Sequence, residues 1–181
     1  MNLPNKITVA RILLIPVFLV VFLLQPFSPI VNQWLALTIF VVAASTDALD
    51  GYYARKLKLV TNFGKLIDPL ADKILVCAAL VAFTAVGAVP AWATVVIVTR
   101  EFYISGFRQL ALEQQVVMAA TKWGKLKTIF QITFIVYVLL PIHFFVFEPV
   151  TLALIITAVA FTVLSAIDYT VKNIGIFKGS L

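Results

Sequence analysis

The chain has 181 residues, of which 62% are hydrophobic and only 12% are charged. A soluble domain of this length carries about a quarter charged residues, so the composition excludes an ordinary water-soluble domain and predicts a polytopic membrane protein. We expect one membrane domain over residues 1–181.

Apolar runs close to the roughly 20 residues needed to cross a bilayer recur along the whole chain. They predict six transmembrane helices, at approximately residues 8–25, 32–54, 66–87, 91–112, 127–146 and 149–170. Before the first run, Pro4 cannot continue a helix backward and Asn5 can cap one, which predicts a short amphipathic segment at the membrane surface. The expected fold class is therefore an all-α integral membrane protein.

The charged residues are distributed unevenly between the two ends of these predicted spans. All 14 Lys and Arg residues fall at one end, and the opposite loops, near residues 26–31, 88–90 and 147–148, contain none. Because basic loops stay on the cytoplasmic side, we expect both termini in the cytoplasm and the protein in the cell membrane. Membrane placement also accounts for the net charge of +6, because a basic surface suits anionic lipid. The basic residues form no nucleic-acid motif.

Four of the eight acidic residues lie between residues 47 and 72, flanked by apolar runs. At about 100° per residue, Asp47 and Asp50 fall on one helix face, and Asp68 and Asp72 share a face of the next helix. Ionised carboxylates at membrane depth are costly, so four together require bound cations. One or two divalent metal ions are the simplest such cations.

Small and basic residues accompany these carboxylates. Gly51 and Ala54 leave the carboxylate face of the first helix without bulk, so a ligand can approach its backbone closely. Arg55 adds a guanidinium group able to bind phosphate through two hydrogen bonds. Carboxylates that bind metal beside cations that bind phosphate indicate phosphate chemistry. Two alternatives remain open on spacing alone: a proton relay in a small transporter, or carboxylates paired with basic residues.

The predicted fourth span is interrupted by Arg100, Glu101 and Arg108. The two arginines can lie on one helix face with Ser105, where they would hold a second phosphate while Glu101 orients or neutralises one of them. A structural ion pair is the alternative. We expect the last two spans, beyond residue 128, to contribute only hydrophobic character.

A polar loop precedes the predicted fifth span and carries lysines, among them Lys125 and Lys127. They suit anchoring at the cytoplasmic boundary. The alternative is a phosphate contact, because the segment lies at a helix N-terminus, where backbone amides and the helix dipole attract anions.

The run D-x-x-D-G-x-x-A-R-x8-G-x3-D-x3-D over residues 47–72 resembles the signature of the CDP-alcohol phosphatidyltransferases, with every fixed position filled. The resemblance implies an integral membrane enzyme, a homodimer, that uses CDP-diacylglycerol or a related donor and releases CMP. It implies that the four aspartates hold two ions, Mg²⁺ or Mn²⁺, and that Asp72 is the general base. It further implies contacts with the CDP moiety, which we assign to Gly51, Ala54, Arg55 and Gly64.

Three further segments resemble particular branches of this family. P-N-x-I-T-x-x-R over residues 4–11 is similar to the phosphatidylglycerophosphate synthase and cardiolipin synthase branches. It implies that Asn5, Thr8 and Arg11 line the active site, the alternative being a helix cap with an arginine that reaches the membrane surface.

R-E-x-x-x-S-G-x-R over residues 100–108 and G-K-x-K-T over residues 124–128 resemble the first of these branches. They imply glycerol 3-phosphate as the acceptor, its phosphate held by Arg100, Arg108 and Lys125. The nearest alternative is a sibling enzyme with another acceptor, a cardiolipin synthase or a phosphatidylinositol-phosphate synthase.

Overall fold

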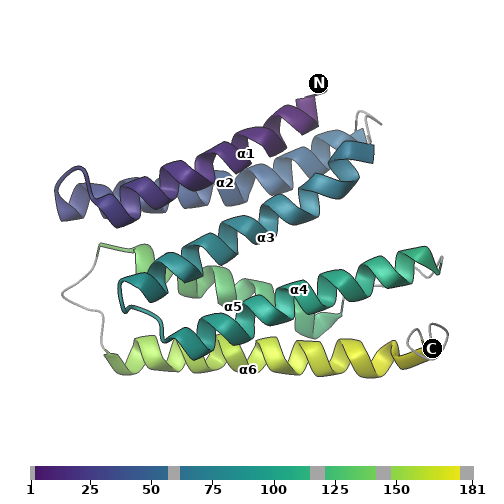
Figure 1. Ribbon diagram of the computed structural model, residues 1–181. Helices are drawn as coiled ribbons and strands as arrows, with labels where there is room; N and C mark the ends of the chain where they lie inside the picture. The colour runs from purple at the N-terminus through teal and green to yellow at the C-terminus, as the bar shows by residue number, and fades with distance from the viewer. Residues whose placement is uncertain (1–2, 57–61, 115–120, 142–147, 176–181) are drawn as a thin grey trace. The chain divides into compact units, whose positions relative to one another are not determined.

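A computed structural model describes the backbone of residues 3–56, 62–114, 121–141 and 148–175, and the side chains of residues 7–46, 70–71, 73–114, 121–141 and 149–175. All regular elements within these ranges are helical, which confirms the predicted all-α class. In chain order they are α1 (Leu3–Leu19), η1 (Val20–Leu24), α2 (Pro29–Lys56), α3 (Asn62–Ala85), α4 (Ala91–Glu113), α5 (Lys122–Leu139) and α6 (Glu148–Lys172) (Figure 1).

Three helical segments in the described ranges are long and apolar enough to cross a membrane: Ile7–Leu24, Pro29–Thr46 and Pro149–Lys172. In α3 the apolar stretch is shorter, Lys73–Ala85, and in α4 the run is broken by Arg100, Glu101 and Arg108. Charges inside a helix lower its hydropathy, so composition supports three spans directly. The count of six spans and the side on which the termini lie stay predictions.

The structure divides into two compact units, and the first comprises Met1–Ala88 with Leu139–His143. Within it, α1 packs against α2 and α3, and α2 packs against α3. The centre is aromatic: fully buried Phe18 stacks on Phe22, with ring centroids 5.8 Å apart, and lies 6.2 Å from Phe40. Buried alanines, such as Ala43 and Ala79, let the helix backbones approach closely.

The connection between η1 and α2 is held by hydrogen bonds of one side chain. Gln25 ends η1 in the left-handed region, with φ of 45°. The buried Asn32 carboxamide then donates to the carbonyl of Phe27 at 2.7 Å and accepts from its amide at 3.2 Å. These two hydrogen bonds fix the start of α2, the helix that contains Asp47 and Asp50.

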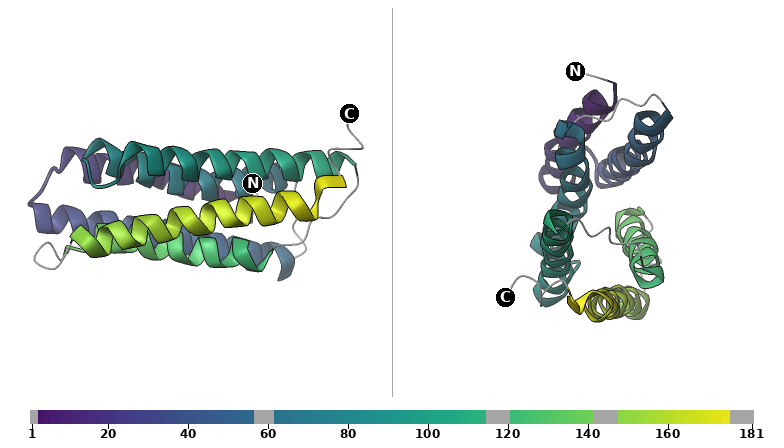
Figure 2. Two further views of the ribbon diagram at one scale, coloured as in Figure 1. Left: turned by 90° about the horizontal axis from the view of Figure 1, so that it is seen from below. Right: turned by 90° about the vertical axis from the view of Figure 1, so that its right-hand side faces the viewer.

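The second unit comprises Val89–Val138 and Phe144–Leu181 and contains α4, α6 and nearly all of α5. A buried cluster of Ile104, Phe107, Ala111 and Tyr169 joins α4 to α6. In Figure 2, α5 lies alongside α6, where Phe130 stacks on Phe161 with ring centroids 4.5 Å apart. The three helices thereby bring the polar residues of α4 next to those of α5 and α6.

Candidate active site

The four aspartates lie on two helices of the first unit. Positions 47 and 50 belong to α2, and positions 68 and 72 belong to α3. The same helices contain Gly51, Ala54, Arg55 and Gly64. The side chains of these residues and of Asn5 lie outside the described part of the chain, so their metal, CDP and active-site roles stay predictions. Among the side chains that are described, no three His, Cys, Asp or Glu residues gather at one point.

Arg11 of α1 is directed at the segment of α2 that leads into the aspartates. Its side chain is fully buried, as is that of Thr8 one turn earlier. Arg11 Nε donates to Thr46 Oγ1 at 3.2 Å, and the Thr46 hydroxyl donates to the carbonyl of Ala43 at 2.6 Å. An arginine that reaches the membrane surface would expose its guanidinium group, whereas this group is held at the residue next to position 47.

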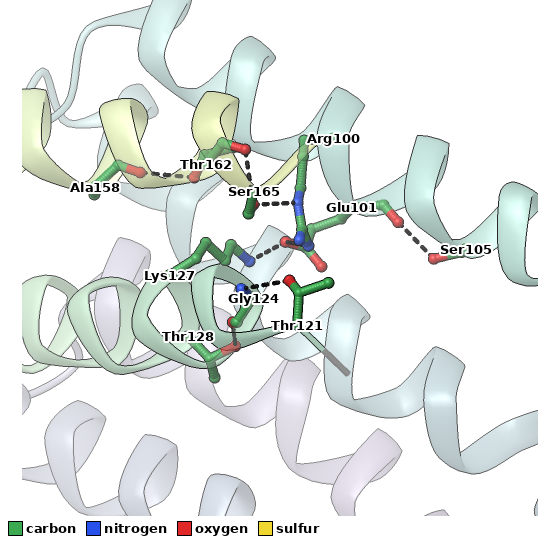
Figure 3. A network of polar contacts seen from close by, with 10 residues as sticks. All are labelled: Arg100, Glu101, Ser105, Thr121, Gly124, Lys127, Thr128, Ala158, Thr162 and Ser165. Atoms are coloured by element: carbon green, nitrogen blue, oxygen red, sulfur yellow. Dashed lines mark hydrogen bonds and ion pairs between the residues drawn. The ribbon is translucent and has the colours of Figure 1, made fainter. Parts of the chain in front are cut away.

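A second polar group lies inside the α4–α6 unit and is centred on Glu101 (Figure 3). One carboxylate oxygen of Glu101 is 3.4 Å from Arg100 Nη1 and also forms an ion pair with Lys127 Nζ. Glu101 and Lys127 are buried, at 8% and 4% exposure. A buried charge is tolerated when it is paired and hydrogen-bonded, and here two cations share one carboxylate.

Arg100 is also anchored to the last helix. Its Nε donates to Ser165 Oγ at 3.1 Å, and the Ser165 hydroxyl donates to the carbonyl of Thr162 at 2.9 Å. Ser165 is fully buried. The contact therefore fixes one edge of the Arg100 guanidinium group against α6 (Figure 3).

Arg108 is held in a similar way, two helical turns further along α4. Its Nε donates to the hydroxyl of Tyr169 at 2.9 Å, and its guanidinium carbon lies 5.5 Å from the centre of the Tyr169 ring. Arg108 is exposed, whereas Tyr169 is only 2% exposed. Both arginines contact α6, as expected of residues on one helix face.

Lys127 of α5 forms the ion pair with Glu101, whereas Lys125 lies on the exposed side of α5. Thr121 precedes α5, and its hydroxyl oxygen accepts a hydrogen bond from the amide of Gly124 at 3.1 Å. One of the helix N-terminal amides that could bind phosphate is therefore already hydrogen-bonded to Thr121. A β-carbon built at Gly124 would lie 4.0 Å from Arg100 Nη2, so the start of α5 is close to this guanidinium group.

The expectation that the last two spans contribute only hydrophobic character is wrong for α6. Ser165 and Tyr169 contact both arginines of α4. The sequence held a weak signal for this face, because Thr162, Ser165 and Tyr169 follow the three- and four-residue spacing of one helix side. Hydroxyl groups in apolar helices usually bond to their own backbone, as Thr157 does to Ala153, so the spacing alone did not single them out.

Comparison with known proteins gives consistent matches over most of the chain. The family model of the CDP-alcohol phosphatidyltransferases matches residues 1–164. A CDP-diacylglycerol–glycerol-3-phosphate 3-phosphatidyltransferase of Bacillus subtilis is 45% identical over 95% of both chains. A probable phosphatidylglycerophosphate synthase of Mycobacterium tuberculosis is 34% identical over 94% of this chain and 81% of the relative. A relative from Rickettsia bellii with the same name as the Bacillus protein is 41% identical over 72% of this chain and 70% of its own.

Proposed function

This chain belongs to the CDP-alcohol phosphatidyltransferase family, and on that premise we propose that it transfers the phosphatidyl group of CDP-diacylglycerol to glycerol 3-phosphate. The products are phosphatidylglycerophosphate and CMP. The name of the Bacillus subtilis relative, which is similar along almost its whole length, supports both substrates.

The observation that carries the acceptor assignment is the charge of the Glu101 group. Among the described side chains, three cations, Arg100, Arg108 and Lys127, accompany one carboxylate, Glu101, so positive charge is in excess there. A phosphate monoester carries about −1.5 to −2 at neutral pH. Glycerol 3-phosphate therefore matches this excess, whereas an acceptor without a phosphate group would leave it uncompensated.

This arrangement changes the assignment of individual acceptor residues. Arg100 and Arg108 keep the role of binding the acceptor phosphate, since their planar groups can form two parallel hydrogen bonds to it. Lys127 adds positive charge from a buried position. Lys125 lies on the exposed side of α5, where it attracts the anionic substrates as they approach.

The donor is assigned to the motif on α2 and α3. These helices pack against each other, and carboxylate oxygens are ligands that Mg²⁺ and Mn²⁺ prefer. We therefore assign two ions to four residues, Asp47, Asp50, Asp68 and Asp72. When bound, such ions neutralise the diphosphate of the donor. The CDP moiety is assigned to Gly51, Ala54, Arg55 and Gly64.

Asp72 acts as the general base of the transfer. It takes the proton of the acceptor hydroxyl while that oxygen attacks the phosphorus of the phosphatidyl group. The new O–P bond forms as the bond to CMP breaks, so no covalent enzyme intermediate is needed. Asn5, Thr8 and Arg11 line this site from α1, and the burial of Arg11 beside Thr46 supports that placement.

The membrane setting follows from the same premises. We propose six spans in the cytoplasmic membrane, both termini and the active site on the cytoplasmic side, and a homodimer. Three apolar helices and the one-sided distribution of Lys and Arg support the spans and the orientation.

Release of CMP with different acceptors tests the proposal. Purified protein with Mg²⁺ and CDP-diacylglycerol should release CMP when glycerol 3-phosphate is added, and not with serine, inositol phosphate or phosphatidylglycerol. Turnover with one of these and none with glycerol 3-phosphate would reject the acceptor. Metal-independent flux across reconstituted vesicles, without CMP release, would favour the transporter.

Substitution of one acceptor arginine sharpens the same assay. Arg108→Ala should raise the KM for glycerol 3-phosphate and leave the KM for CDP-diacylglycerol close to that of the wild type. Lys172→Ala is the matched control, because Lys172 is another cation of this unit but pairs with Asp168 at 2.6 Å.

A further inference from the structure

The last helix holds both arginines that we assign to the acceptor phosphate, and it does so through the same atom of each. Nε of Arg100 donates to the Ser165 hydroxyl, and Nε of Arg108 donates to the Tyr169 hydroxyl. We propose that Ser165 and Tyr169 are positioning residues, which orient the two guanidinium groups for the phosphate of the acceptor. The inference rests on the proposed function. Both residues lie beyond residue 164, where the match to the family model ends.

The planarity of the guanidinium group explains how one hydrogen bond can set its direction. All N–H donors of arginine lie in one plane in a fixed fork. A bond from Nε therefore fixes that plane and leaves the terminal Nη groups for other partners. Arg100 uses Nη1 for Glu101, and the Nη edge of Arg108 is the part that a phosphate would meet.

The two anchors are more deeply buried than the arginines they hold. Tyr169 is 2% exposed and contacts Phe107 edge to face, with ring centroids 6.2 Å apart. Ser165 is fully buried and is itself oriented by its bond to the carbonyl of Thr162. Arg108, in contrast, is exposed. A fixed anchor under an accessible guanidinium group lowers the rotamer entropy that would be lost when an anion binds.

The spacing of the anchors also favours a shared ligand. Ser165 and Tyr169 are one turn apart on α6, whereas Arg100 and Arg108 are two turns apart on α4. Each anchor fixes one positive group on the seam between α4 and α6. Like charges on one helix face repel, and a dianion bound between them removes this repulsion.

The seam between α4 and α6 provides a matched control. The hydroxyl of Tyr103 lies 3.0 Å from Thr170 Oγ1 and joins the same two helices. Its ring stacks on Phe107, at a centroid distance of 6.1 Å. Tyr103→Phe therefore removes the same atom as Tyr169→Phe from the same packing layer, but the hydrogen bond that is lost does not involve an arginine.

The test compares the KM for each substrate in these variants, with CMP release as the readout. Tyr169→Phe should raise the KM for glycerol 3-phosphate about tenfold, the effect of one hydrogen bond to a charged group, and leave the KM for CDP-diacylglycerol unchanged. Ser165→Ala, which does not disturb the aromatic cluster, should do the same. Tyr103→Phe should change neither value. Equal effects of the two tyrosine variants, or equal losses for both substrates, would overturn the positioning role.

A double variant distinguishes action through Arg108 from a separate effect. If Tyr169 works through Arg108, then Tyr169→Phe should add no further loss in an Arg108→Ala protein. Additive losses would overturn the proposal. A wild-type protein that releases no CMP with glycerol 3-phosphate would reject the proposed function together with this inference. Normal turnover of the wild type with an unchanged KM in Tyr169→Phe and Ser165→Ala would reject the inference alone.

Discussion

Removal of the Glu101 carboxylate should destabilise the protein more than removal of either single cation beside it. The side chains of Arg100, Glu101 and Lys127 are 12%, 11% and 5% exposed, and both cations meet the same carboxylate oxygen. Glu101→Gln therefore removes the carboxylate that buried Lys127 and half-buried Arg100 share. Lys127→Met leaves Glu101 still paired with Arg100.

Breaking a buried ion pair by removing one partner costs about 3–5 kcal/mol. We expect Glu101→Gln to reach this range and Lys127→Met to cost about 1–3 kcal/mol, because one pair survives. One kcal/mol shifts the melting temperature of a protein of this size by about 2–4 °C, so Glu101→Gln should lower it by roughly 6–20 °C. The double variant should recover part of that loss, since only one of the two cations that share the carboxylate then remains.

Thermal unfolding of the purified protein in detergent measures these effects. Glu113→Gln is the matched control, because Glu113 is an exposed glutamate of the same helix and its replacement should change stability by less than about 0.5 kcal/mol. The reasoning is refuted if Lys127→Met costs as much as Glu101→Gln, or if the double variant shows the sum of the two single losses.

Three further predictions concern the donor site and the core. Asp72→Asn should lower CMP release about 10²–10⁴-fold, as expected for loss of a general base; near-normal turnover in a CMP assay would contradict that role. Arg11→Lys should lower CMP release while the protein stays folded, because an ammonium group cannot reproduce the planar fork held at Thr46; full activity would return Arg11 to a structural role. Phe18→Ala should cost about 3–5 kcal/mol in thermal unfolding because Phe18 is fully buried, whereas the exposed Phe102→Ala should cost little; equal effects would show that the aromatic centre of the first unit is not tightly packed.

The helices could be predicted from the sequence because each apolar run is long and bounded by turn residues. α4 begins at Ala91 as expected, since Pro90 adopts an extended conformation just before it. α5 begins at Lys122, five residues earlier than predicted, because Thr121 caps it and makes the end of the expected polar loop helical. Composition located the helices better than it located their ends.

The candidate site could be predicted only in part. Arg100 and Glu101 could be predicted as site residues because they are charged residues inside an apolar run. Which lysine of α5 meets Glu101 depends on how that helix is rotated against α4, and two residues two positions apart point to nearly opposite sides. Tyr169 meets Arg108 across 61 positions of sequence, and no local pattern reports which of two distant helices are neighbours.

The dependence of CMP release on metal tests the central claim most directly, namely that Asp47, Asp50, Asp68 and Asp72 hold divalent ions that the transfer requires. Purified protein would be stripped with a chelator and titrated with Mg²⁺ or Mn²⁺ in the presence of CDP-diacylglycerol and glycerol 3-phosphate. We expect no CMP release without metal, full recovery on its addition, and a higher metal requirement in Asp47→Asn. Unchanged CMP release from the stripped protein would contradict the account.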